Sequence, residues 1–190
     1  DLVTKADMPP AARLAILEQV NRMLFETGAG EVLDIINDIA EEATRGHLLK
    51  VHLLKTCKYS FCSPLLIGAI AAGGSRKQMD LLESYALPIG VAYQLHDDLL
   101  GLFGDEAEIG KPIYSDLRQG KQTLLMIEAR RRGNVDQRDY LTRILGRSDI
   151  TVEEAENVKQ IVKDTGAFDY SIQLADRFKN DALLPLDEAY

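Results

Sequence analysis

The longest helical pattern in the chain is SRKQMDLLESYALPIGVAYQLHDDLLGLF, which covers residues 75 to 103. Ser75 is a suitable cap for its first turn, whereas Pro88 lacks an amide hydrogen and predicts a bend or an interruption. The same apolar periodicity predicts further helices over residues 9–26, 31–43, 46–59, 123–131, 136–145 and from 152 onward. Gly28 and Gly30 are expected to end the first of them. Because no segment shows sustained strand alternation, the sequence predicts an all-α bundle.

The composition is that of one folded helical domain over residues 1–190, with 46% apolar and 27% charged residues. The net charge of -8 argues against nucleic-acid binding, which depends on lysine and arginine side chains that neutralise phosphates. No apolar run approaches the roughly 20 residues that span a bilayer, so we expect no stable membrane insertion and a cytoplasmic protein. Cys57 and Cys62 have neither redox nor zinc-ligand spacing and are expected to be reduced thiols.

Two adjacent carboxylates lie within the apolar stretch GVAYQLHDDLLGLFGD, residues 90 to 105. One helix face carries four positions spaced i, i+3, i+4 and i+7: Gln94, Asp97, Asp98 and Gly101. Carboxylates in such apolar surroundings are costly without a counter-charge, and Mg²⁺ is commonly held by one or two carboxylates together with a substrate's phosphates. The alternative interpretation is that the pair lies on a solvated helix face.

Three lysines accompany these carboxylates. Lys55 lies on an otherwise apolar helix, and Lys111 and Lys121 lie in Gly-Lys dipeptides on a long glycine-rich loop. A lysine on such a loop can approach a diphosphate closely and supply a point charge. Each lysine alone has a solvated interpretation, but carboxylates for a metal and lysines for a diphosphate together predict one anion site.

The order of these motifs along the chain resembles the trans-type polyprenyl synthetase family, which includes farnesyl and geranylgeranyl diphosphate synthases. The resemblance lies in GEVLDI at 30–35, KT at 55–56, YQLHDDLLG at 93–101, GKP at 110–112, DLRQGKQT at 116–123 and TGAFDYSIQLADRFKNDA at 165–182. It implies an isoprenoid-synthase-type helical bundle and a Mg²⁺-dependent prenyltransferase. Such an enzyme condenses isopentenyl diphosphate with an allylic diphosphate to make a longer polyprenyl diphosphate.

The resemblance also implies a role for each site residue. Asp97 coordinates Mg²⁺ directly, and Asp98 supports the waters bound to the metal. The allylic substrate is held by Lys55, Thr56, Gln94, Lys111 and Lys121. Because the leaving diphosphate gains negative charge in the transition state, a metal and lysines directed at it stabilise that state more than the ground state.

The chain departs from the family pattern in several places. Gly101 stands where the second aspartate-rich motif usually ends in a third aspartate, a loss that nearby Asp105 can offset. Glu31 replaces the usual glutamine and Cys57 a usual alanine. The first aspartate-rich motif, which family proteins place upstream with the cations for isopentenyl diphosphate, does not occur in residues 1–190. We therefore expect a portion of a longer protein that lacks both ends and is inactive alone.

Three other functions stay open. A non-catalytic binding subunit of a heteromeric prenyl diphosphate synthase is favoured by Gly101 alone. A terpene cyclase on the same fold shares metal-triggered ionisation but has no need of the lysine pattern. A plain helical scaffold is the last alternative. For the family's usual homodimer, the apolar face of residues 9–39 and the small-residue stretch 63–74 are the expected surface.

Overall fold

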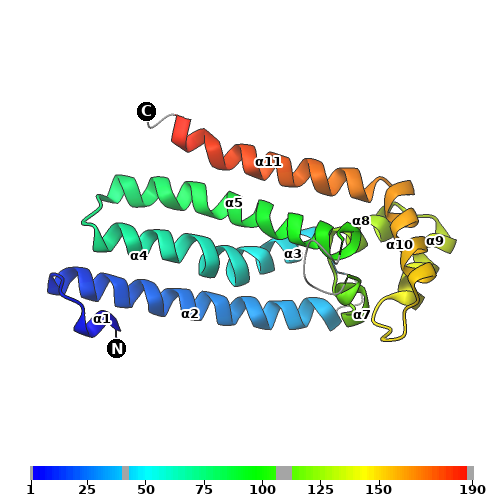
Figure 1. The fold of residues 1–190 in the computed structure, drawn as a ribbon, viewed down its shortest axis with the longest axis horizontal. Coiled ribbons are helices and arrows are strands. Elements are labelled where there is room, and N and C mark those ends of the chain that lie inside the picture. Colours follow the sequence, from blue (N-terminus) through cyan, green and yellow to red (C-terminus); the bar gives the residue numbers. More distant parts are fainter. Residues whose placement is uncertain (1, 40–42, 106–112, 188–190) are drawn as a thin grey trace. The chain divides into compact units, whose positions relative to one another are not determined.

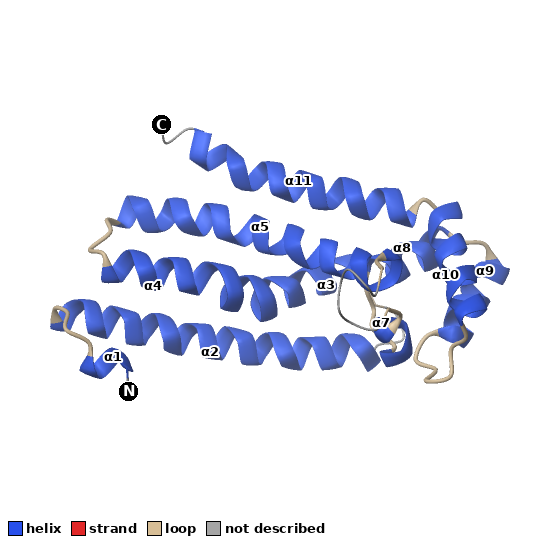
Figure 2. Ribbon diagram, viewed as in Figure 1, coloured by secondary structure: helices blue, strands red, loops and turns tan. Residues whose placement is uncertain are grey.

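The computed structural model of the chain describes residues 2–39, 43–105 and 113–187. Every regular element within these ranges is a helix, as Figures 1 and 2 show, so the predicted all-α class is confirmed for them. The helices in chain order are α1 Leu2–Lys5, α2 Pro10–Ile39, α3 Arg45–Val51, η1 His52–Cys62, α4 Ser63–Ala71, α5 Arg76–Phe103, α7 Ser115–Gln119, α8 Leu124–Arg132, α9 Val135–Ile144, α10 Val152–Asp164 and α11 Ala167–Asp187.

Packing groups the chain into two compact units. The first unit comprises Asp1–Asp34, Leu49–Ala92 and Arg177–Tyr190, and the second comprises Ile35–Leu48 and Tyr93–Asp176. The boundaries between the units fall within α2, α3, α5 and α11. Among the described residues, no helix combines the length and the apolar character that crossing a membrane requires.

The first unit contains two close helix contacts that depend on glycine. A Cβ atom on Gly30 of α2 would lie 2.6 Å from the backbone nitrogen of Lys55, and one on Gly90 of α5 would lie 2.8 Å from Sγ of Cys57. The prediction that Gly28 and Gly30 end a helix is therefore wrong, because α2 continues through both to Ile39. Gly30 instead allows the backbone of α2 to approach η1.

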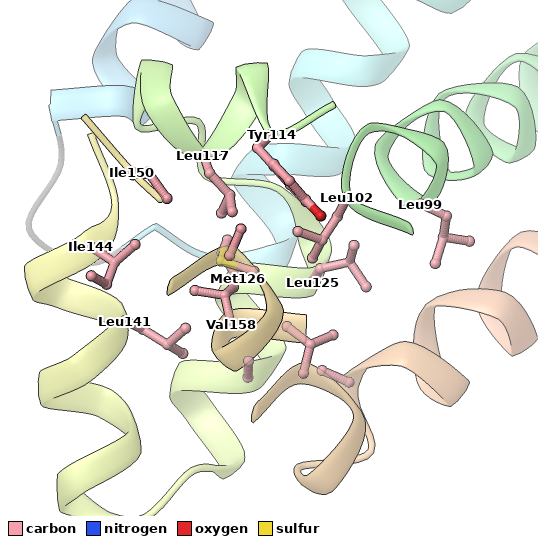
Figure 3. Close-up of a cluster of buried hydrophobic side chains, with 14 residues drawn as sticks. Leu99, Leu102, Tyr114, Leu117, Leu125, Met126, Leu141, Ile144, Ile150 and Val158 are labelled. Atoms are coloured by element: carbon pink, nitrogen blue, oxygen red, sulfur yellow. The ribbon is translucent and has the colours of Figure 1, made fainter. Parts of the chain in front are cut away.

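The second unit has a continuous apolar core, which Figure 3 shows. Its fourteen buried side chains come from α5, α7, α8, α9, α10, α11 and the segments between them: Leu99, Leu102, Tyr114, Leu117, Leu125, Met126, Ala129, Leu141, Ile144, Ile150, Ala155, Val158, Val162 and Ala167. In Figure 3 the side chains of Leu117, Met126 and Val158 point toward one another from three different helices. This core fixes the end of α5, which carries the paired aspartates, against α7 and α8.

The helix boundaries follow local chemistry closely. Ser75 caps α5 as predicted, since its hydroxyl oxygen accepts a hydrogen bond from the Gln78 backbone nitrogen at 3.3 Å. The predicted interruption at Pro88 does not occur, and α5 passes through this residue as one helix. Ala86 and Val91 on either side of Pro88 are buried, so packing holds the turns that the proline weakens.

Candidate functional site

Asp98 is the most buried carboxylate of the predicted site. It is 8% exposed, and its Oδ1 accepts a hydrogen bond of 3.2 Å from Nε2 of Gln94, one turn earlier on α5. Asp97, the preceding residue, is only half-buried. The helix therefore presents one accessible carboxylate and one that is enclosed.

Electrostatics show that the enclosed carboxylate carries its charge at a cost. Burial raises the pKa of Asp98 to about 7, and the nearby charges of Asp116 and Asp97 raise it further, while the Gln94 hydrogen bond and Lys121 oppose the shift. A carboxylate held in this way is stabilised in its charged form by a nearby cation. We call Asp97, Asp98, Asp116 and Lys121 the acidic cluster.

Lys121 is fixed to Asp116 by both backbone and side chain. Its Nζ lies 2.7 Å from Oδ1 of Asp116, and its backbone nitrogen donates to the Asp116 carbonyl oxygen at 3.0 Å. Between them the chain turns back at Gly120, whose φ of 77° lies in the left-handed region that glycine adopts without strain. The turn after α7 thus brings Lys121 near enough to Asp98 to lower the pKa of that carboxyl, while its predicted contact with a diphosphate stays a prediction.

Tyr114 anchors the start of α7. It has a φ of 66°, its backbone nitrogen donates to the carbonyl oxygen of Gly101 at 3.1 Å, and its hydroxyl donates to Oε1 of Glu156 at 2.9 Å. A non-glycine residue in this conformation is strained, so these two contacts must hold it there. The first contact links the start of α7 to the end of α5 and the second links it to α10, so together they determine where Asp116 lies.

Asp116 is a carboxylate beside the paired aspartates that the sequence did not single out. A Cβ atom on Gly101 would lie 2.7 Å from Oδ2 of Asp116, so this carboxylate fills the space beside the position where the family pattern has its third aspartate. The sequence prediction named Asp105 for this compensation. The only signal in the sequence was the place of Asp116 in DLRQGKQT, since its distance from Gly101 depends on the fold.

Lys55 lies in a second cluster, within the first unit. Its Nζ is 2.9 Å from Oε2 of Glu31 and 2.8 Å from Oδ2 of Asp34, and we call these three residues the Lys55 cluster. Partial burial lowers the pKa of Lys55, but the hydrogen bonds and charges of Asp34 and Glu31 outweigh it and raise the pKa overall. The lysine expected to bind a diphosphate is therefore already paired with two carboxylates.

The helix that carries Lys55 and Thr56 has an unusual form. Residues 52–62 make a π-helix, η1, where the sequence predicted ordinary helix up to residue 59. Wide turns of this kind occur often at functional sites. Within η1, burial lowers the pKa of His52 to about 4, while the charge of Asp34 opposes the shift. The half-buried Thr56 lies next to Lys55 on the same wide turn.

The structure brings together only part of the predicted residue set. Gln94, Asp97, Asp98 and Lys121 lie in the second unit, whereas Lys55 and Thr56 lie in the first. Lys111 lies outside the described residues. The convergence of the three lysines on one anion site therefore stays a prediction.

The carboxylates of the acidic cluster fit one mode of metal binding. Within residues 2–39, 43–105 and 113–187, no group of three or more His, Cys, Asp or Glu side chains is arranged to hold an ion by itself. Mg²⁺ usually keeps several waters and binds to one or two carboxylates plus substrate phosphates, which is a less demanding arrangement. The acidic cluster meets this lower requirement, because Asp97 is accessible and the charge of the enclosed Asp98 needs a cation.

Comparison with known proteins identifies the family of the chain. The sequence profile of the polyprenyl synthetase family matches residues 2–165. The chain belongs to the polyprenyl synthetase family. Among curated family members, a geranylgeranyl diphosphate synthase of Saccharolobus solfataricus is 31% identical over 159 residues, which are 84% of this chain and 47% of that protein. A short chain isoprenyl diphosphate synthase of Methanocaldococcus jannaschii is 34% identical over 160 residues, covering 77% of this chain and 49% of that protein.

Solved structures of polyprenyl synthetases have the same fold. A geranylgeranyl pyrophosphate synthase of Corynebacterium glutamicum, complexed with isoprenyl diphosphate and magnesium, superimposes with a TM-score of 0.89 at 31% identity. The match covers 94% of this chain and 51% of that one. The predicted isoprenoid-synthase-type bundle is thus confirmed, and the chain spans about half the length of the relatives it matches.

Proposed function

We propose that this chain forms part of the active site of a Mg²⁺-dependent trans-prenyltransferase, which condenses isopentenyl diphosphate with an allylic diphosphate. The observation that carries the proposal is the acidic cluster, in which the enclosed Asp98 lies close to Asp97, Asp116 and Lys121. The complex of the C. glutamicum relative with magnesium and isoprenyl diphosphate supports the same ligands here.

In the proposed reaction the C–O bond of the allylic diphosphate breaks, and its electron pair stays on the diphosphate. The double bond of isopentenyl diphosphate then forms the new carbon–carbon bond, and loss of a proton restores a double bond. Bound Mg²⁺ supplies positive charge for the leaving diphosphate. Asp97 would hold the metal and Asp98 would support the waters bound to it, while Gln94 fixes Asp98 through its hydrogen bond of 3.2 Å. Nζ of Lys121 lies 2.7 Å from Oδ1 of Asp116. We propose that Lys121, Lys55, Thr56 and Lys111 hold the allylic diphosphate, as the resemblance implies.

The non-catalytic binding subunit is the second candidate. Gly101 favours it, since the third aspartate of the motif is missing. Asp116 weakens that argument, because its carboxylate lies beside Gly101 and restores a third acidic group. A subunit without chemistry has no need for an enclosed carboxylate that requires a cation, so the enzyme is the better supported function.

The experiment that tests the proposal is a condensation assay in Mg²⁺ with isopentenyl diphosphate and a series of allylic diphosphates. The 190-residue chain is assayed alone and as part of a longer protein that contains it. We expect turnover in the longer protein and none in the isolated chain, which lacks the first aspartate-rich motif. Robust turnover by the isolated chain contradicts the divided site, and no turnover in either favours the binding subunit. A cyclic product made from the allylic diphosphate alone identifies a terpene cyclase.

We also propose a homodimer, formed through the apolar surface of α2. The helix leaves large apolar side chains exposed where a monomer usually buries them: Leu14, Leu24, Phe25, Val32, Ile35 and Ile36 are each more than half exposed. A self-complementary patch of this kind favours a twofold dimer. Light scattering on the wild-type chain and on Phe25→Asp tests it, since Phe25 is 80% exposed and its replacement leaves the core unchanged. We expect a dimer in the first and a monomer in the second.

A further inference from the structure

A basic pocket of about 830 Å³ lies in the second unit, at the start of α3 and along α8 and α9. We define it by six of its lining residues: Arg45, Gln122, Glu128, Arg130, Arg131 and Arg138. None of the carboxylates of the acidic cluster lines it. The proposed condensation therefore gives its arginines no role.

The charge of this pocket is opposite to that of the chain. The whole chain has 30 acidic and 22 basic residues, with a net charge of -8. Among the described residues, the pocket is lined by four arginines and one carboxylate, that of Glu128. In a chain with an acidic excess, a cavity with this lining concentrates positive potential, which raises the local concentration of anions.

Arg130 shows most clearly that a counter-charge is missing. Its Nη1 donates to Oε1 of Gln122 at 2.9 Å, and Gln122 is itself buried. Its Nε is buried and has no hydrogen-bond acceptor among the described residues. Burial lowers the pKa of this guanidinium, and no carboxylate in the described part of the chain offsets that cost. A desolvated cation with a free donor calls for an anion.

Two other arginines of the pocket also have neutral partners. Arg45 donates to the hydroxyl of Tyr170, and Arg138 donates to the carbonyl oxygen of Gly133 at 2.9 Å. These contacts orient the guanidinium groups without neutralising them.

The one carboxylate of the pocket is already occupied. Oε2 of Glu128 lies 2.8 Å from Nη2 of Arg131 and 2.9 Å from Nε of Arg132, and its side chain is 2% exposed. It therefore neutralises Arg131 and a neighbour outside the pocket. Within the described residues, the positive charges of Arg45, Arg130 and Arg138 have no carboxylate partner.

We propose that the basic pocket binds a soluble phosphate-bearing anion of the diphosphate class. Guanidinium groups match the paired oxygens of a phosphate group in geometry and form charge-assisted hydrogen bonds with them. Three guanidinium groups that have no carboxylate partner among the described residues lie around one cavity, and they suit an anion with two linked phosphate groups better than a single small ion. This site uses arginines alone and needs no divalent metal, so it does not rest on the proposed condensation.

The test is calorimetric titration of the purified chain with inorganic diphosphate, in buffer freed of metal by a chelating resin. The variant Arg130→Gln/Arg138→Gln removes two of the unneutralised charges. The matched control Arg143→Gln/Arg177→Gln changes the net charge by the same amount at two exposed positions outside the pocket. We expect the first variant to weaken binding at least ~10-fold, the scale of one lost charge-assisted hydrogen bond, and the control to stay near wild type. Circular dichroism confirms that both variants keep their helices.

Two further arms separate the basic pocket from the acidic cluster and from a membrane-binding surface. Asp97→Asn, a change in the acidic cluster, is expected to leave metal-free binding unchanged. Vesicles containing an anionic phospholipid test a membrane headgroup as the source of the phosphate. Three outcomes overturn the proposal. The first is equal weakening of binding in the pocket variant and in its arginine control, the second is no measurable binding of diphosphate, and the third is binding to vesicles but not to free diphosphate.

Discussion

The acidic cluster and the Lys55 cluster combine carboxylates and lysine in different proportions. The first has three carboxylates and one lysine, and its central Asp98 is 8% exposed. The second has one lysine between two carboxylates, and the side chains of Lys55 and Glu31 are 36% and 52% exposed. In the acidic cluster the burial of Asp98 dominates, so we expect a cation from outside the protein to bind there. In the Lys55 cluster ion pairing dominates, so the diphosphate that Lys55 is predicted to bind must compete with Glu31 and Asp34 for the lysine.

The largest expected effect comes from removing the accessible carboxylate of the acidic cluster. In a protein that shows condensation activity, we expect Asp97→Ala to lower turnover at least ~10²-fold, because it removes an electrostatic element that acts on the transition state. The measurement is turnover over a range of Mg²⁺ concentrations, with helicity checked by circular dichroism. Asp139→Ala, an exposed change on α9, is the control. Near-normal turnover by a folded Asp97→Ala protein contradicts the metal assignment.

His52, on the helix that carries Lys55, and Asp98 of the acidic cluster predict opposite responses of stability to pH. The pKa of His52 is lowered to about 4, so the unfolded chain binds a proton that the folded chain rejects, and stability rises with pH between about 4 and 6.5. The pKa of Asp98 is raised to about 7, so the folded chain holds a proton that the unfolded chain releases, and stability falls as pH rises from about 4 to 7. The two contributions have opposite signs over most of this pH range, so they partly cancel in the wild type.

Single variants separate these two contributions. We expect His52→Gln to become less stable as pH rises through this window, and Asp98→Asn to become more stable. Urea unfolding in metal-free buffer at several pH values measures both slopes. The same slope in both variants contradicts the burial of at least one of the two groups, and Mg²⁺ is expected to reduce only the slope that Asp98 causes.

A carboxylate exchange within the acidic cluster has a smaller expected effect. Asp116→Ala should weaken Mg²⁺ binding in the presence of diphosphate about tenfold, the effect of roughly 1.4 kcal/mol. Gly101→Asp alone should also be unfavourable, because its Cβ would lie 2.7 Å from Oδ2 of Asp116. The double variant Gly101→Asp/Asp116→Ala should bind better than either single variant. Calorimetric Mg²⁺ titration checks the order, and additive losses contradict the proposal that Asp116 replaces the missing aspartate.

The sequence predicted more of the chemistry than of the spatial arrangement. Helix periodicity and the Ser75 cap are local properties, and the structure confirms both. The roles predicted for Asp97, Asp98 and Lys121 stay predictions, although all three residues lie in the second unit. Gly30 was misread because a glycine that ends a helix and one that lets two helices approach look alike in sequence. The role of Asp116 and the carboxylate pairing of Lys55 could not be predicted, since both depend on contacts between separate elements.

The smallest expected effect concerns Glu31, where the family pattern has glutamine. The pair between Lys55 and Glu31 measures 2.9 Å but is partly exposed, so its contribution is at most about 1 kcal/mol. Glu31→Gln removes a carboxylate that competes for Lys55 while Asp34 still orients the lysine at 2.8 Å. We expect the dissociation constant for an allylic diphosphate to fall about two- to fivefold, and the gain to shrink at high salt because exposed charges are screened.

The control for this effect is Glu18→Gln, which makes the same change of charge at another exposed position of α2. Equilibrium binding of an allylic diphosphate, measured for both variants at low and high ionic strength, separates a local effect of Glu31 from a general effect of net charge. An equal gain in the two variants assigns the effect to the whole chain rather than to the Lys55 cluster. Weaker binding by Glu31→Gln shows that Glu31 positions Lys55 for the diphosphate instead of competing for it. In that case the carboxylates around Lys55 assist diphosphate binding, as we propose for those around Lys121, and the two clusters do not differ in this respect.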